Sequence, residues 1–145
     1  MNKILFVCAM LLVVAAGVAQ FFQPVRTNPP ADPAASFAAV AKPHGAVVAV
    51  VDRACRDCHS NNTVWPWYSK VSPVSWLVAQ DVQKGRARLN FSQWNIYGPE
   101  MTQIRMQEAC QEVKAGKMPL THYLYLHPEA KLSPQDVVVL CASAQ

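Results

Sequence analysis

The stretch Cys55-Arg56-Asp57-Cys58-His59 determines how the rest of the chain is interpreted. It matches C-x-x-C-H, the attachment motif of a c-type haem. Positions three apart lie on one face of a helical turn, so the thiols of Cys55 and Cys58 can both reach the vinyl groups on one edge of a porphyrin. His59 follows directly and can supply the proximal ligand of the iron. The motif therefore predicts one covalently attached haem, haem c.

Two other functions are open to the same residues. A thioredoxin-like dithiol would need a βαβ context, which the sequence does not show, and would give His59 no role. In a zinc site, Cys55 and Cys58 would combine with His122 and His127, whose H-x4-H spacing suits two zinc ligands. However, 63 residues separate Cys58 from His122, against roughly 12–15 in a zinc finger. Haem is the preferred interpretation, and a dithiol and a zinc site are kept as alternatives.

Length and charge set broad limits on the fold and its partners. The chain has 145 residues and a formal net charge of +4, which fits one domain with a modest core. Its basic residues are scattered, without a run that would indicate nucleic acid. We therefore expect a small globular domain that does not bind nucleic acid.

Residues 1–22 form an apolar leader. Lys3 gives a short positive region, and residues 4–19 are 16 residues without a charge. This length is near the upper limit of a signal-peptide core and slightly short of a spanning helix, which needs roughly 18 residues or more. The segment predicts export, either as a signal peptide or as an uncleaved membrane anchor, of which we favour the anchor. The domain would then lie at the periplasmic side of the bacterial inner membrane, anchored there or secreted to the periplasm.

Residues 23–45 are expected to be a spacer, and residues 46–145 the haem-binding domain. The spacer holds five prolines among small residues, a composition typical of an extended or irregular segment. In an oxidising compartment, Cys110 and Cys141 can form a disulfide or remain two buried thiols, and the spacing leaves both open.

The domain is predicted to be all-α, a small cytochrome c-like bundle of about four short helices around the haem. Periodicity and capping residues predict helices over residues 46–59, 73–89, 100–115 and 134–142, with a single turn over 121–126. Residues 90–98 are expected to be a loop. The sequence shows no strand pairs and no internal repeat.

Met118 is the preferred distal ligand. It lies just after a predicted helix, and Pro119 fixes the backbone so that a thioether can be presented to iron. His122 is the serious rival, because ligation by two histidines is chemically sound. Other candidates have simpler explanations: a cap or surface position for His127, and core-like helical spacing for Met101 and Met106.

Two further residues are candidates for the haem pocket. Trp65 belongs to Val64-Trp65-Pro66-Trp67-Tyr68, whose aromatic side chains could form a rigid wall against the ring. Arg86 could pair with a haem propionate, because its planar guanidinium suits carboxylates. From spacing alone, a solvated side chain explains Arg86 better.

Taken together, the motifs resemble those of the small haem-binding domain family of bacterial exported proteins. The matching stretches are C-x-x-C-H-S-N-x-T at 55–63, W-P-W-Y-S at 65–69, S-P-V-S-W at 72–76, D-V-x-x-G-R at 81–86, L-N-F-S at 89–92, G-x-M-P at 116–119 and H-P-x-A-x-L-S at 127–133, with R-T-N-P-P at 26–30. The resemblance implies a mono-haem cytochrome c-like domain. It implies thioether bonds at Cys55 and Cys58, His59 as proximal ligand and Met118 as distal ligand. This chain departs from the family at its last helix, where the usual tryptophan is absent and Leu140-Cys141-Ala142 stands instead.

Three functions follow from these expectations. One haem with both axial positions filled, and no other catalytic constellation, predicts an electron carrier rather than an enzyme, with a redox partner protein that the sequence does not identify. An open distal site would instead predict a gas or peroxide sensor, or a peroxidase-like enzyme with His122 as distal base. The third function is a zinc-stabilised interaction module.

Overall fold

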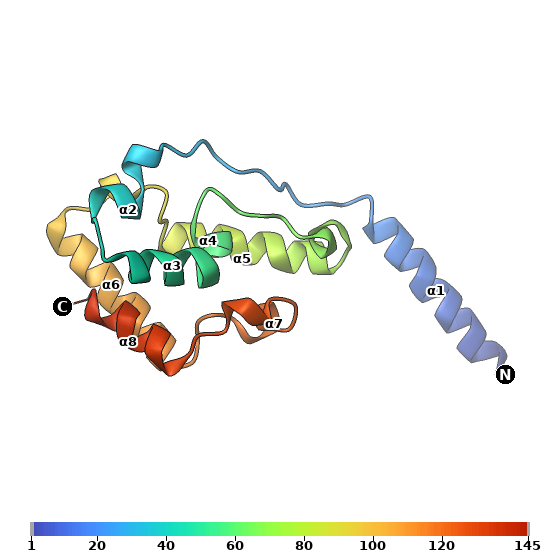
Figure 1. Cartoon of the computed structure of the whole chain (residues 1–145). Helices are drawn as coiled ribbons and strands as arrows, with labels where there is room; N and C mark the ends of the chain where they lie inside the picture. The colour runs from blue at the N-terminus through green and yellow to red at the C-terminus, as the bar shows by residue number, and fades with distance from the viewer. Residues whose placement is uncertain (1, 145) are drawn as a thin grey trace.

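The chain folds into helices joined by short loops, and the computed structural model describes residues 2–144 (Figure 1). No strand occurs within that range, so the predicted all-α class is confirmed. The α-helices outnumber the predicted four, because several are single turns. They are α1 (Lys3–Ala19), α2 (Phe37–Val40), α3 (Gly45–Ala54), α4 (Arg56–His59), α5 (Val74–Arg88), α6 (Pro99–Lys114), α7 (Thr121–Leu124) and α8 (Pro134–Ala142), and the 3-10 turns are η1 (Pro33–Ala35), η2 (Trp67–Lys70), η3 (Trp94–Ile96) and η4 (Pro128–Ala130).

The C-x-x-C-H motif lies at a break between α3 and α4. A single helix was predicted here, but Cys55 has φ −123° and ψ −31° and separates the two. The short helix α4 packs against α5. At their contact, a Cβ on Gly85 would overlap the carbonyl oxygen of Cys58 and lie 2.9 Å from its carbonyl carbon. A glycine at position 85 is what allows the haem motif to approach α5 so closely.

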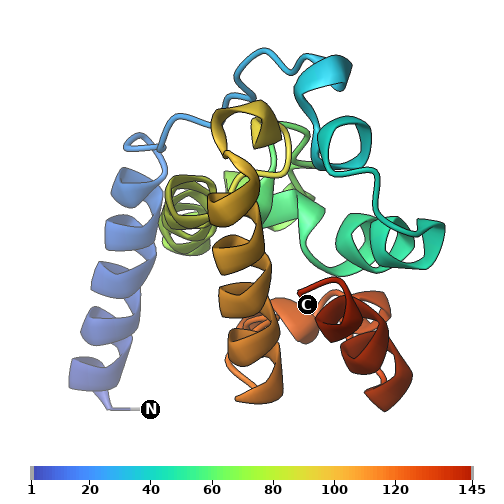
Figure 2. The same ribbon diagram turned by 90° about the vertical axis from the view of Figure 1, so that its left-hand side faces the viewer.

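Three further helices, α3, α6 and α8, pack together through α8. Helix α6 packs on α8, and α8 packs on α3 (Figure 2). Cys110 of α6 and Cys141 of α8 form a disulfide, with Cα atoms 5.0 Å apart. This resolves the alternative that the sequence left open. The predicted start of α8 is also confirmed, because Ser133 and Asp136 form a capping box.

An aromatic cluster fills the core. Trp94 has no exposed surface. Its indole stacks on the ring of Phe91 at 5.4 Å between centroids, and the ring of Phe37 meets it edge-on at 4.6 Å. Phe37 comes from the expected spacer and Trp94 from the expected loop. Isolated aromatic residues in short turns produce no periodic pattern, so the sequence did not identify them as core.

The expected spacer lies against the domain for most of its length (Figure 1). Its C-terminal part forms η1 and α2, where the Ser36 hydroxyl accepts a hydrogen bond from the Ala39 N–H. Residues 23–32 form no helix or turn. Within them, residues 26–30, which we call the strap, run alongside the loop that follows the haem motif. The Asn28 side chain donates to the Thr63 carbonyl at 2.9 Å, and the Asn61 side chain donates to the Pro30 carbonyl at 3.0 Å.

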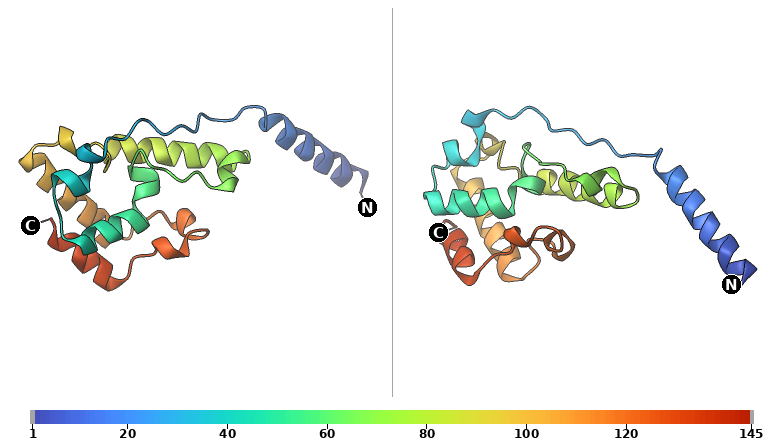
Figure 3. Two further views of the ribbon diagram at one scale, coloured as in Figure 1. Left: turned by 45° about the horizontal axis from the view of Figure 1, so that its top comes forward. Right: turned by 45° about the vertical axis from the view of Figure 1, so that its right-hand side comes forward.

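Helix α1 stands apart from the rest of the molecule. It projects from one end of the domain (Figures 1 and 3) and has no buried residue. Among residues 2–144, no helix combines the length and the apolar character needed to cross a membrane.

Candidate haem site

A cavity of about 640 Å³ brings together three of the predicted site residues, Cys55, His59 and Met118. Its volume falls within the roughly 300–1,000 Å³ of small-molecule and cofactor sites. Most of the wall is apolar, as a porphyrin ring requires. The apolar lining comes from α3, the segment after α5, α6, the loop before α8 and α8 itself, through Ala54, Leu89, Phe91, Ala109, Val113, Pro119, Leu132 and Leu140.

His59 is fixed by two contacts with the segment that follows α5. The Nδ1 atom of its ring lies 3.1 Å from the Leu89 carbonyl oxygen, and the His59 carbonyl accepts a hydrogen bond from the Phe91 N–H at 2.8 Å. Leu89 is extended, so its carbonyl points away from the helical pattern of α5. A carbonyl only accepts hydrogen bonds, so Nδ1 carries the proton in this contact and Nε2 keeps a free lone pair. This is how second-shell partners orient metal-binding histidines.

The electrostatic setting of His59 also favours metal binding. Burial lowers the pKa of its imidazole, although its hydrogen bonds with backbone carbonyls act in the opposite direction. The ring is therefore neutral near pH 7, and only neutral imidazole is a metal ligand.

The two thiols of the motif are partly buried, and both are protonated. Desolvation raises the pKa of Cys55 to about 12, and the neighbouring Cys58 adds to the effect. Desolvation likewise raises the pKa of Cys58 to about 12, with Asp81 the next cause. Cys55 lines the cavity, whereas Cys58 lies in α4 and is not part of the lining.

Met118 reaches the cavity from the turn after α6. Gly116 has φ +67°, the left-handed conformation that ends many helices. The N–H groups of Lys117 and Met118 both donate to the Glu112 carbonyl, at 3.0 and 3.3 Å. These bonds hold the turn against the end of α6, and Met118 and Pro119 both line the cavity.

Arg105 of α6 also lines the cavity, and the sequence did not suggest it. Its Nη1 pairs with the Glu108 carboxylate at 2.8 Å, while its Nε is buried without a hydrogen-bond partner. A buried donor without an acceptor costs about 1–3 kcal/mol. The only sequence signal was its place on the same helix face as Glu108, Ala109 and Glu112, three to four residues apart.

These residues fit a haem. The apolar walls suit the macrocycle, the imidazole and thioether are donors that haem iron accepts, and the free Nε of Arg105 suits a propionate carboxylate. Arg88 lines the same cavity and adds a second guanidinium.

Arg86 and Trp65 lie outside the cavity lining. The Arg86 guanidinium donates to the carbonyls of Ser60 and Thr27 and to the side chains of Asn28 and Thr63, all at 2.8–2.9 Å. The Trp65 indole N–H donates to the Asn28 side chain at 3.1 Å. Both residues thus attach the strap to the loop after the haem motif.

The other ligand candidates lie elsewhere. His122 pairs with Asp81 at 2.7 Å, and His127 accepts or donates a hydrogen bond with the Tyr68 hydroxyl at 2.7 Å. Met106 is buried in the core and Met101 is partly exposed on α6. Nowhere in the described chain do three or more His, Cys, Asp or Glu side chains form a group that could hold a metal ion, so the two halves of the considered zinc site are not brought together.

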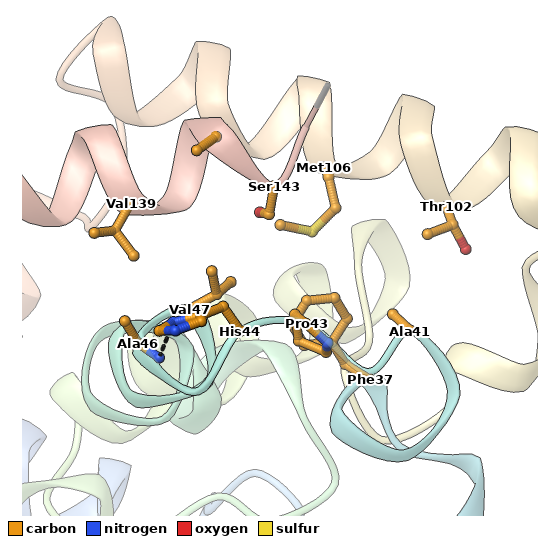
Figure 4. A pocket seen from close by; sticks show the side chains of 11 residues that line it. Phe37, Ala41, Pro43, His44, Ala46, Val47, Thr102, Met106, Val139 and Ser143 are labelled. Carbon is orange, nitrogen blue, oxygen red and sulfur yellow. Dashed lines mark hydrogen bonds between the residues drawn. The ribbon is translucent and has the colours of Figure 1, made fainter.

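A second cavity, of about 540 Å³, lies between the α2–α3 region and helices α6 and α8. Figure 4 shows Phe37, Val47 and Met106 around it, with His44, Thr102 and Ser143 as its polar members. Neither His59 nor Met118 contributes to it.

Comparison with known proteins agrees with the site. The profile of the haem-binding domain family matches residues 14–145. No curated protein and no solved structure matched. The matched range includes every residue of the cavity and most of the chain. The protein therefore belongs to the haem-binding domain family.

Proposed function

We propose that the protein is a mono-haem c-type cytochrome that carries single electrons at the periplasmic side of the inner membrane. The observation that carries the proposal is the meeting of Cys55, His59 and Met118 in one apolar cavity, although 62 residues separate Cys55 from Met118. Haem bound there would supply one-electron redox chemistry.

Each residue of the site has a separate task. Cys55 and Cys58 are the thioether positions, His59 is the proximal ligand and Met118 is the distal ligand. Arg105, with Arg88, would hold the propionates. Two protein ligands leave no iron position for a substrate, which favours electron transfer over catalysis, and a Met/His pair raises the reduction potential relative to other axial sets.

The burial of the thiols bears on how the haem is attached. A protonated thiol is a poor nucleophile, and the pKa values of both thiols lie near 12 in the folded chain. We therefore expect attachment to precede complete folding of the domain and to need a haem-maturation system.

Two features support the proposed location. The apolar leader α1 precedes the domain, and the Cys110–Cys141 disulfide suits an oxidising compartment. We take α1 to be retained as an anchor.

The test is a reduced-minus-oxidised absorbance spectrum and a carbon monoxide titration of the exported protein, produced with a haem-maturation system. The proposal expects a thioether-haem spectrum that carbon monoxide does not change. The Cys55→Ser/Cys58→Ser variant is the control and should carry no covalent haem. Ready binding of carbon monoxide by the wild type would indicate a sensor or an enzyme instead, and wild-type protein without covalent haem would contradict the proposal altogether.

A further inference from the structure

Residues 69–77 reverse the usual burial of polar and apolar side chains. Ser69 and Ser75 have no exposed surface, and Ser72 is 7% exposed. The apolar residues between and after these serines are 42–44% exposed, namely Val71, Val74, Trp76 and Leu77. Contiguous exposed apolar side chains of this kind usually mark an interaction site.

The reversal is maintained by specific contacts. The Ser69 hydroxyl donates to the Pro66 carbonyl at 2.6 Å. The Ser72 hydroxyl donates to the carbonyl of Ala19 at 3.1 Å and lies 3.3 Å from the Ser75 hydroxyl. With the serines satisfied inside, the apolar side chains of the same segment must point outward.

Helix α1 leaves the domain at this segment. The Gln20 side chain donates to the Lys70 carbonyl at 2.5 Å and accepts from the Ser72 N–H at 3.0 Å, and the Trp76 indole N–H donates to the Phe22 carbonyl at 2.6 Å. Figures 1 and 3 show α1 projecting from this end of the domain. Phe21 and Phe22, 87% and 68% exposed, connect the apolar surface of α1 with that of residues 71–77.

We infer that this surface, formed by Phe21, Phe22, Val71, Val74, Trp76 and Leu77, rests on a lipid bilayer that also takes up the side chains of α1. We call it the membrane face. The inference rests on the proposed location at the membrane and names the part of the domain that touches it.

Lipid is favoured over a protein partner by the form of α1. Its apolar side chains are exposed on all sides, as a surrounding apolar solvent requires, whereas a protein partner would cover one side. Trp76 also has the character of an interfacial residue, with an apolar ring outside and its N–H bonded to the chain. The exposed Lys70 beside it can meet lipid phosphates.

The inference can be tested with the full haem-loaded chain in phosphatidylethanolamine/phosphatidylglycerol vesicles that contain a phospholipid with a photoreactive diazirine in its acyl chain. Labelled residues are mapped by mass spectrometry. We expect labelling of α1 and of residues 71–77, several-fold above that of Val138. Val138 is the matched control, because it is an apolar residue on α8 with 61% exposure and no place in the membrane face.

A variant makes the test specific. Leu77→Asp places a charge on the membrane face at a position that is already 44% exposed, so the fold should be kept. It should lose most of the labelling at residues 71–77 and keep that of α1, while the absorbance spectrum of the same sample reports whether haem is bound.

Two results would overturn the inference. Labelled α1 with residues 71–77 at the level of Val138 would contradict the membrane face and leave the membrane location standing. Absence of labelling in α1 as well would contradict both. In each case the absorbance spectrum shows whether the protein binds haem, independently of the labelling result.

Discussion

The Nδ1 atom of His59 lies 3.1 Å from the carbonyl oxygen of Leu89, although the two residues are 30 positions apart. This contact leaves the other ring nitrogen, Nε2, free, and His59 lines the same cavity as Met118. The backbone of the protein therefore orients the ring, as second-shell partners do for metal-binding histidines.

Replacing Met118 by alanine should change the sixth ligand of the iron. We expect an altered absorbance spectrum, new carbon monoxide binding and a lower reduction potential, because the thioether favours the reduced iron. His122→Ala is the control, since His122 pairs with Asp81 away from the cavity. An unchanged spectrum in Met118→Ala, with a changed one in His122→Ala, would move the distal ligand to His122.

Gly85→Ala should disturb the haem motif. Its Cβ would overlap the Cys58 carbonyl, and forcing extra volume into a packed contact destabilises by about 1–3 kcal/mol. We expect this loss in denaturant unfolding, together with a lower yield of covalent haem. Gly45→Ala is the matched control, because no atom lies within 4 Å of the position of its Cβ. Equal stability of the two variants would mean that the contact between α4 and α5 can relax freely.

Arg105→Gln should lower the reduction potential of the haem. A positive charge beside the cavity opposes the extra positive charge of oxidised iron, so its removal favours the oxidised form. Protein-film voltammetry measures the shift.

Arg86→Gln should instead lower the stability of the domain, because it breaks contacts between the strap and the loop after the motif. A larger change of potential in Arg86→Gln than in Arg105→Gln would contradict this division of roles.

The Cys110→Ser/Cys141→Ser variant should be less stable by about 3–4 kcal/mol, the entropic effect expected for a closed loop of this length. The two cysteines are 31 positions apart in the sequence, and the loop between them includes Met118 and the whole connection between α6 and α8. Chemical denaturation of the haem-loaded protein, with and without the disulfide, provides the measurement. A loss below about 1 kcal/mol would show that packing of α6 on α8 suffices.

Asp136→Asn should destabilise the protein at neutral pH but not in acid. The backbone N–H and hydroxyl of Ser133 and the Arg53 guanidinium lower the pKa of the Asp136 carboxyl. A carboxyl whose pKa is lower in the folded chain stabilises the fold above its unfolded pKa of about 3.9, and this contribution disappears as the pH falls through its folded pKa. Unfolding curves of the two proteins should therefore differ at pH 7 and converge as the pH falls below the unfolded pKa and through the lower folded pKa. A constant difference across this range would mean that the lost interaction does not depend on charge.

Local sequence signals were sufficient for helices α5, α6 and α8 and for the motif. The starts of α6 and α8 follow from Pro99 and from the Ser133-Pro134 pair, and C-x-x-C-H with G-x-M-P named residues that the fold then placed in one cavity. Such signals depend only on neighbours along the chain. They do not say which side of a helix meets a distant segment.

Contacts between distant segments account for what the sequence missed. Arg86 and Arg105 look alike as helix cations, yet one binds the strap and the other lines the cavity. Phe37 and Trp94 lie in short turns without periodicity, and only the folded chain shows that they share a core. Tertiary packing determines where these side chains lie, and no local sequence pattern indicates it.

The position of the strap has a consequence for processing of the chain. The strap residues that contact the domain begin at Arg26. Arg26 donates to the Ser69 carbonyl, and Asn28 donates to the Thr63 carbonyl. Thr27 and Asn28 accept hydrogen bonds from Arg86. A peptidase cut after Ala19 would remove α1 and one hydrogen bond to Ser72, but none of the contacts of the strap. A released form and a retained form of the protein would consequently share the same haem domain, and a cell could change where this domain resides without changing its chemistry.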